Sequence, residues 1–98
     1  MYATIAALRW NDASGDRELV EPEVVVDIIW ASALPTDRLQ HVRVSESVEH
    51  GVLNVVLLMH AAGVEAAVCV GEALLDRSAI ASRRLIGWRF STVSAALL

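Results

Sequence analysis

Cysteine and lysine are the scarce residues of this chain, and each shortage narrows what the chain can be. A single cysteine, Cys69, excludes an intramolecular disulfide and a CxxC metal or redox motif. All eight basic residues are arginines, and the abundant alanine and valine beside them are typical of a GC-rich bacterial genome. We therefore expect a bacterial protein from a reducing compartment.

The chain also has no net positive charge, and we expect no secretory signal at its start. Its formal net charge of −4 argues against sequence-independent binding of nucleic acid, because such binding depends on basic side chains that neutralise phosphates. Residues 1–10 have neither the basic start nor the small-residue cleavage site of a secretory signal. The apolar stretch 52–70 contains Asn54, His60 and Glu65, and a central acid is costly in a membrane. We expect a cytoplasmic protein that binds neither nucleic acid nor membrane.

Hydrophobic surface is what the chain has in abundance, since 55% of its residues are apolar and 20% are charged. With 98 residues, this composition suits one packed domain spanning 1–98. The most informative segment is 52–60, VLNVVLLMH, which is apolar at both alternating sets of positions. A strand covered on one face alternates apolar and polar residues, so the second face of this segment needs a cover of its own.

Hydrophobic periodicity predicts four strands and two helices. The strands are expected over 2–10, 39–47, 52–60 and 85–93, and the helices over 22–34 and 64–78. By propensity alone, VVVDIIW in the first helix would be a strand. Pro22 at the first helical position, acidic Glu21 and Glu23 beside it, and Pro35 at the end favour a helix instead.

The same patterns predict which side chains form the core. Strict alternation over 39–47 points Val42 and Val44 inward, and Trp88 and Phe90 are the core residues of the last strand, with Ile86 on the same face. Gly51 is the expected hinge of a hairpin, and residues 11–16, NDASGD, form a turn. The buried stripe of the second helix is expected to contain Val64, Ala67, Val68, Gly71, Leu74, Leu75 and Ser78.

The resulting order, β-α-β-β-α-β, is that of an α+β ferredoxin-like sandwich: a four-stranded antiparallel sheet with two helices on one face. In element order and length, the chain resembles the small dimeric ferredoxin-like proteins called α+β barrels. These include cofactor-light monooxygenases and polyketide cyclases. The resemblance involves no family motif, so it implies a fold and not an activity.

Such a sheet leaves one face without helices. If Leu53, Val55, Leu57 and Met59 pack under the helices, the bare face contains Val52, Asn54, Val56, Leu58 and His60. An apolar patch of this kind marks an interface or a ligand groove, and a two-fold dimer with stacked sheets would bury it. We predict a homodimer whose interface contains Val52, Val56 and Leu58.

Polar residues are expected on the same bare face. The candidate ligand-binding residues are His41, Arg43, Asn54, His60 and Arg89, with Arg9 near them. Arginine and histidine above an apolar floor would suit an anionic or carboxylate-bearing small molecule. The alternative is that these residues are solvated strand edges and the rim of the dimer.

No motif indicates catalysis. The chain has no Ser-His-Asp order, phosphate-binding glycine loop or paired acids, and the spacing of His41, His50 and His60 matches no metal motif. We predict no catalytic residue, metal or cofactor. Cys69 is expected to be an exposed, incidental thiol. The cluster of Arg77, Arg83 and Arg84 either complements a helix C-terminus or docks an acidic partner.

Two functions stay open. The first is a non-catalytic, homodimeric accessory or interaction protein of a bacterial system, with the possibility of a further protein partner. The alternative is a small dimeric α+β-barrel enzyme or ligand-binding protein for an apolar, aromatic or polyketide-like molecule, in which His41, His60 or Arg43 supplies the polar chemistry. A pocket of about 300 Å³ or more between sheet and helices would favour the second.

Overall fold

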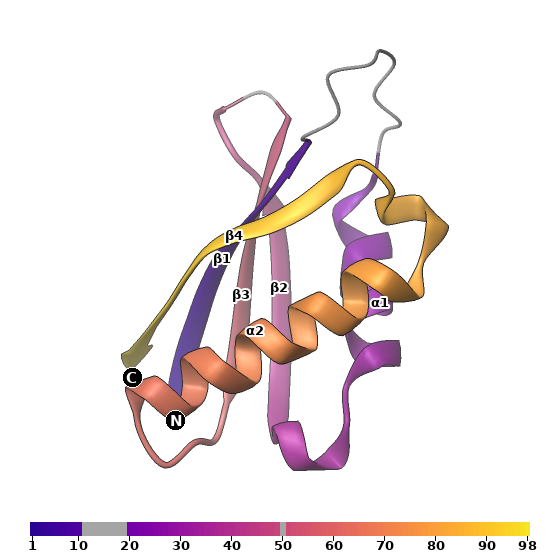
Figure 1. The fold of residues 1–98 in the computed structure, drawn as a ribbon. Helices are drawn as coiled ribbons and strands as arrows, with labels where there is room; N and C mark the ends of the chain where they lie inside the picture. Colours follow the sequence, from indigo (N-terminus) through magenta and orange to yellow (C-terminus); the bar gives the residue numbers. More distant parts are fainter. Residues whose placement is uncertain (11–19, 50) are drawn as a thin grey trace.

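The computed structural model describes residues 1–10, 20–49 and 51–98. Within these ranges two α-helices, two short 3-10 helices and an antiparallel sheet alternate along the chain, which confirms the α+β class (Figure 1). The elements are β1 (Tyr2–Trp10), α1 (Pro22–Ser32), η1 (Pro35–Asp37), β2 (Leu39–Glu46), β3 (Val52–Met59), α2 (Val64–Ala81), η2 (Arg83–Leu85) and β4 (Trp88–Leu97). The turn predicted over 11–16, like His50, lies outside the described residues.

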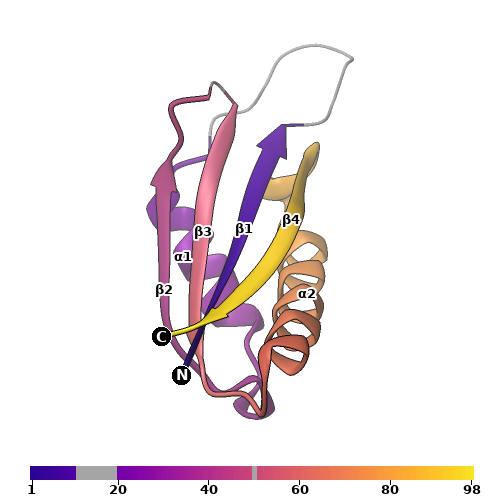
Figure 2. The same ribbon diagram turned by 90° about the vertical axis from the view of Figure 1, so that its left-hand side faces the viewer.

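The sheet has the strand order β2-β3-β1-β4, and each neighbouring pair is antiparallel. Thus β3 and β1 are central, whereas β2 and β4 are edge strands. Both α-helices lie on the same side of the sheet (Figure 2). We call the side under α1 and α2 the covered face, and the other side, on which no helix of the described residues lies, the open face.

The covered face contains the hydrophobic core. From β3, the side chains of Leu53, Val55, Leu57 and Met59 all belong to it, as expected for one of the two alternating sets. Leu8 of β1, with Val25 and Ile29 of α1 and Leu74 and Leu75 of α2, completes its centre, and each of these side chains is at most 1% exposed. Above this centre, the Trp10 and Trp88 rings meet edge to face with centroids 5.7 Å apart.

The helix α1 forms despite its β-branched residues because the residues of its first turn stabilise a helix start. Pro22 occupies a first-turn position, and the Glu21 carbonyl accepts hydrogen bonds from the backbone N–H groups of Val24 and Val25 at 3.0 and 3.3 Å. The helix ends at Ser32, two residues before the predicted end. Ala33 is already extended there, and Pro35 begins a separate 3-10 turn.

A glycine sets how closely α2 approaches the sheet. A Cβ atom on Gly71 would lie 2.6 Å from Cγ2 of the buried Thr4 in β1, a separation that real side chains do not tolerate. The Thr4 hydroxyl donates to the Ala67 carbonyl of α2 at 3.4 Å, so helix and strand also share a hydrogen bond. The predicted buried stripe is right at Ala67, Gly71, Leu74, Leu75 and Ser78. It is wrong at Val64, which is 46% exposed in the first turn of α2, and Val68 is only half-buried.

The alternation predicted for β2 is interrupted near its start. The register shifts between Leu39 and His41, so Leu39 packs against the core although strict alternation assigned it to the face of His41. Beyond this irregularity the prediction holds, since Val42 is buried and Val44 is half-buried against the core. The hairpin turn also forms as expected at Gly51, whose φ of 79° is a conformation that glycine adopts without strain.

The last strand was predicted too early in the chain. Residues 83–85 form η2 and Gly87 turns with a φ of 85°, so β4 begins at Trp88 and extends to Leu97. Ile86, expected on the same face as the core residues Trp88 and Phe90, is 69% exposed, whereas Leu85 is buried. Trp88 is buried and Phe90 is half-buried against the core, as predicted.

A partly buried ion pair fastens α1 and η1 to α2. Arg77 Nη2 donates to Asp37 Oδ2, and Arg77 Nε donates to the Ser32 carbonyl at 3.3 Å. Asp37 is only 6% exposed, and its Oδ2 also accepts the Leu34 backbone N–H at 2.7 Å. Arg77 is therefore a structural brace, and the prediction that it belongs to a basic surface cluster with Arg83 and Arg84 was wrong. Among the described helices, none is long and apolar enough to cross a membrane.

Candidate functional site on the open sheet face

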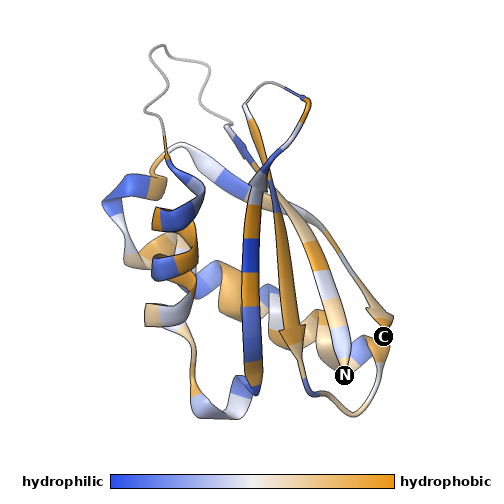
Figure 3. Ribbon diagram, turned by 180° about the vertical axis from the view of Figure 1, so that it is seen from behind, coloured by the Kyte–Doolittle hydropathy of each residue, from blue (hydrophilic) through white to orange (hydrophobic). Residues whose placement is uncertain are grey.

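The centre of the open face is an apolar strip on the two inner strands. Cross-strand register places Ala3 beside Leu58 and Ile5 beside Val56, one pair above the other. Ile5 is 46% exposed, and Val56 and Leu58 are half-buried. Figure 3 shows the nearly uniform hydrophobicity of β3 beside the alternation of β2. We define the apolar strip as Ala3, Ile5, Ala7, Val52, Val56 and Leu58.

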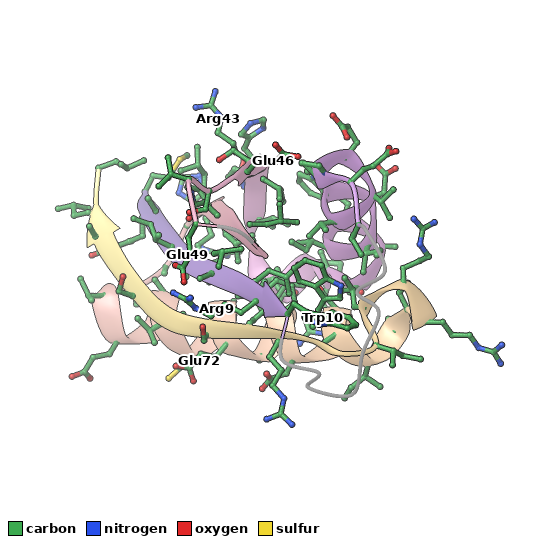
Figure 4. The ribbon with its side chains drawn as sticks, turned by 90° about the horizontal axis from the view of Figure 1, so that it is seen from above. Arg9, Trp10, Arg43, Glu46, Glu49 and Glu72 are labelled. Atoms are coloured by element: carbon green, nitrogen blue, oxygen red, sulfur yellow. The ribbon has the colours of Figure 1, made fainter. Side chains whose placement is uncertain are left out.

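Polar side chains of the edge strand β2 border this strip. His41 pairs with Leu58, and Arg43 pairs with Val56, so both stand beside the most exposed part of the strip. Both are exposed, and Figure 4 shows Arg43 pointing away from the molecule. Asn54, also exposed, interrupts the apolar residues of β3 opposite Ala7. The two predicted residues of β2 thus form a rim, with Asn54 diagonal to Arg43.

A second polar group lies at the other end of the strip. Arg9 of β1 is the cross-strand partner of both Val52 and Arg89, so two arginines are neighbours on the open face. Glu49 balances them, because its carboxylate accepts from Arg9 Nη1 at 3.2 and 3.3 Å (Figure 4). Both partners of this ion pair are largely exposed. Such a pair stabilises a fold by about 0–1 kcal/mol.

The predicted ligand-binding residues do not converge on one point. Arg43 and Arg89 lie on opposite edge strands, a lateral separation of about 14 Å for three strand spacings. Along the strands, Arg43 lies level with Val56 and Arg89 lies level with Val52, and these two residues of β3 are about 13 Å apart. A small molecule bound at the backbone position of Arg43 would therefore be far from that of Arg89. The structure brings His41 and Asn54 near Arg43 and leaves Arg89 with Arg9.

His60 lies away from the strip as well. Because β3 ends at Met59, the strand alternation that would place His60 on the open face stops before it. Its backbone N–H donates to the Arg38 carbonyl at 3.2 Å, and its side chain lines a surface depression at the end of α1. Trp30 and Arg38 line the same depression and were not predicted as site residues. Trp30 could have been noticed, since it falls outside the apolar stripe of its helix.

Two further sequence expectations concern reactive side chains. Cys69 is exposed on α2, as predicted. Within residues 1–10, 20–49 and 51–98, no three histidine, cysteine or acidic side chains gather closely enough to hold a metal ion. No buried side-chain nitrogen or oxygen in these ranges lacks a hydrogen-bond partner. The buried polar side chains of the described chain thus serve the packing of its elements, as Asp37 and Thr4 do.

The chain was compared with protein-family models, curated proteins and solved structures, and none of them matches it.

Proposed function

We propose that this protein is a non-catalytic homodimer, an accessory or interaction protein of the bacterial cytoplasm, which self-associates through the open face of its sheet. The observation that carries the proposal is the apolar strip: its most accessible residues, Ile5, Val56 and Leu58, are neighbours in register on the two central strands, while charged residues occupy the edge strands. A contiguous apolar surface with a polar rim is typical of protein interfaces. In an isologous dimer the strip of one protomer would lie on the strip of the other.

The fold supports this proposal. The chain order β-α-β-β-α-β and the sheet order β2-β3-β1-β4 are those of a ferredoxin-like sandwich, and we infer that the chain adopts this fold. Because both helices cover the same face of the sheet, the other face can be buried by a second protomer. Ile5, Val56 and Leu58 would then form the centre of the interface, with His41 and Arg43 at its rim. Val52, which is 8% exposed, would lie at the end of the interface near Arg9.

The alternative, an enzyme with a pocket between sheet and helices, has less support. Leu8, Leu57, Met59 and Leu74 fill that space as fully buried side chains. The depression lined by His60 lies at the surface, at the end of α1. The polar residues proposed for catalysis or anion binding are also spread over the sheet.

Sedimentation equilibrium at micromolar concentration tests the proposal directly. We expect a mass of twice 10.6 kDa for the unaltered chain and a monomer for Ile5→Arg, which places a charge in the middle of the strip. The matched control is Ile80→Arg, because Ile80 is an isoleucine on α2 that is 87% exposed and outside the strip. Val56→Arg should repeat the effect of Ile5→Arg from the neighbouring strand.

Three results would overturn the proposal. They are a 10.6 kDa monomer for the unaltered chain, a dimer that survives both strip substitutions, and equal dissociation by Ile80→Arg. Circular dichroism of each variant separates loss of association from loss of fold.

A further inference from the structure

A surface depression of about 460 Å³ lies where α1 ends, beside η1 and the first residues of β2. Its volume falls within the range of about 300–1,000 Å³ in which small-molecule sites lie. The residues that matter for its chemistry are two large apolar side chains, Trp30 and Leu34, and three hydrogen-bond donors, Arg38, Gln40 and His60. It is distinct from the apolar strip, so an occupant would not compete with the proposed dimer.

The apolar part of the depression is unusually exposed. Trp30 is 43% exposed and Leu34 is 49% exposed, and both line the same hollow. Single exposed apolar residues are common on proteins, but a tryptophan and a leucine beside one concavity provide surface that a ring can bury. The indole also offers a face for offset or edge-to-face packing of another aromatic ring.

Among the residues that line the depression, Arg38 carries the one formal charge, which is positive. Arg38 and His60 line it, and neither forms an ion pair within the part of the chain that the structure describes. The acid next to Arg38 in sequence, Asp37, is buried and bound to Arg77. This local excess of positive charge occurs in a chain of net charge −4. The charge therefore favours an anionic occupant.

The end of α1 opposes an anion only weakly. Helix C-termini present carbonyl groups that repel negative charge. Here the Ser32 carbonyl accepts from Arg77 Nε, and the Trp30 carbonyl accepts from the Ala33 backbone N–H. Two of the last carbonyls of the helix are thus already occupied by donors, and the Arg77–Asp37 pair beside them has no net charge.

The turn that carries the donors is held in place by hydrogen bonds. Arg38 has a φ of 53°, the left-handed region that only a minority of non-glycine residues adopt. Its carbonyl accepts both the His60 backbone N–H at 3.2 Å and the Gln40 side-chain amide at 3.4 Å. These bonds fix the backbone of the Arg38 turn and engage the Gln40 amide before any ligand arrives, which lowers the entropic cost of ordering the turn.

We propose that this depression binds a small aromatic carboxylate. The ring lies against Trp30 and Leu34, and the carboxylate accepts hydrogen bonds from the Arg38 guanidinium, whose fork of donors matches a carboxylate in two-point geometry. His60 lines the same depression and is a candidate second donor. The site is independent of the proposed dimer, and a monomeric chain would retain it.

Nuclear magnetic resonance of the ¹⁵N-labelled chain, titrated with naphthalene-2-carboxylate, tests the proposal. The neutral naphthalene-2-carboxamide has nearly the same shape and serves as the matched probe. We expect the Trp30 indole N–H and the backbone amides of Arg38, Gln40 and His60 to shift, with the acid bound about tenfold more tightly because its hydrogen bonds are charge-assisted. Arg38→Gln should abolish that preference, whereas Arg43→Gln on the open face should retain it.

A second variant protects the test against misfolding. Trp30→Leu should weaken both probes to a similar degree, because it removes ring contact and leaves Arg38 in place, and the backbone spectrum shows whether each variant is folded. The proposal is overturned by equal affinities for acid and amide, by acid preference that survives Arg38→Gln, or by shifts confined to the apolar strip. It is equally overturned if millimolar acid leaves the Trp30 indole resonance unmoved.

Discussion

Consecutive residues of β3 differ sharply in environment although they are chemically alike. Leu57 faces the helices and is 0% exposed, whereas Leu58 faces the open side and is half-buried. The same contrast separates Val55 from Val56. Hydrophobicity along the strand is uniform, so the difference comes from what covers each face. The covered face is buried by α1 and α2 of the same chain, whereas the open face still exposes apolar side chains.

The two faces also use ion pairs differently. On the covered side, Arg77 and Asp37 form a pair whose carboxylate is almost completely buried. On the open side, Arg9 and Glu49 pair in solvent. A buried charge is costly to leave without its partner, while an exposed one is hydrated when the partner is removed. The first pair therefore constrains the fold, and the second mainly balances local charge.

The sharpest comparison of the faces is Leu57→Ala against Leu58→Ala. Truncating the buried Leu57 should lower the free energy of unfolding by about 2–5 kcal/mol, because it opens a cavity in the core. Leu58→Ala should cost about 1 kcal/mol or less in the monomer, since that side chain is already partly hydrated. Urea denaturation at low protein concentration measures both. Equal losses would mean that the faces do not differ in packing.

Removing the brace on the covered side should have the next largest effect. Arg77→Met leaves the buried Asp37 carboxylate without its charged partner, and we expect a loss of about 1.5–3 kcal/mol in unfolding free energy. The Arg77 side chain is 36% exposed, so the loss should fall below that of a fully buried pair. Arg83→Met at an exposed position is the control and should change stability little. Similar losses for both variants would contradict a bracing role.

The close approach of α2 to β1 can be tested with a rescue. Gly71→Ala forces its Cβ against Thr4 Cγ2, and the strain should exceed the gain in helix propensity, for a net loss of about 1 kcal/mol. Thr4→Ser removes that methyl group and retains the hydroxyl that bonds to Ala67. The double variant should therefore regain most of the stability lost by Gly71→Ala in thermal unfolding. If the two substitutions instead lower stability additively, the strain in Gly71→Ala does not come from the Thr4 methyl group.

The open-face ion pair should give the smallest effect. Glu49→Gln removes the acid that pairs with Arg9, and we expect a loss of about 0.2–1 kcal/mol at low ionic strength. At about 1 M salt, where the Debye length is near 3 Å, the difference should vanish. Urea denaturation at both salt concentrations measures it. A loss that persists in salt would indicate packing instead of charge.

Much of the fold could be predicted because it depends on local patterns. The bounds of β1 follow from an apolar run that ends in turn residues, and α1 follows from Pro22 with its acidic neighbours. The failures have local causes too. At Leu85–Phe90 an apparent alternation runs across Gly87, whose positive φ breaks it, and in β2 a register shift beside Gln40 returns Leu39 to the core.

The site was less predictable because it depends on residues that are remote in sequence. Arg77 reaches Asp37 across 40 positions, and nothing in RSAIASRRL distinguishes it from the exposed arginines that follow. Alternation correctly placed Arg43 and Arg89 on one face but could not give the strand order that separates them. The hollow at Trp30 requires the end of α1, η1 and the end of β3 together.

The position of β1 between β3 and β4 has a consequence for how the chain folds. The first strand pairs with the last along its whole length, and the Leu98 backbone N–H donates to the Met1 carbonyl at 3.0 Å. The hairpin of β2 and β3 can form early from neighbouring residues, but β4 joins the sheet only after a loop of nearly the entire chain has closed. Folding should therefore take milliseconds or longer, as in domains dominated by contacts between distant residues, and a ribosome must release the last strand before the first can be enclosed on both sides.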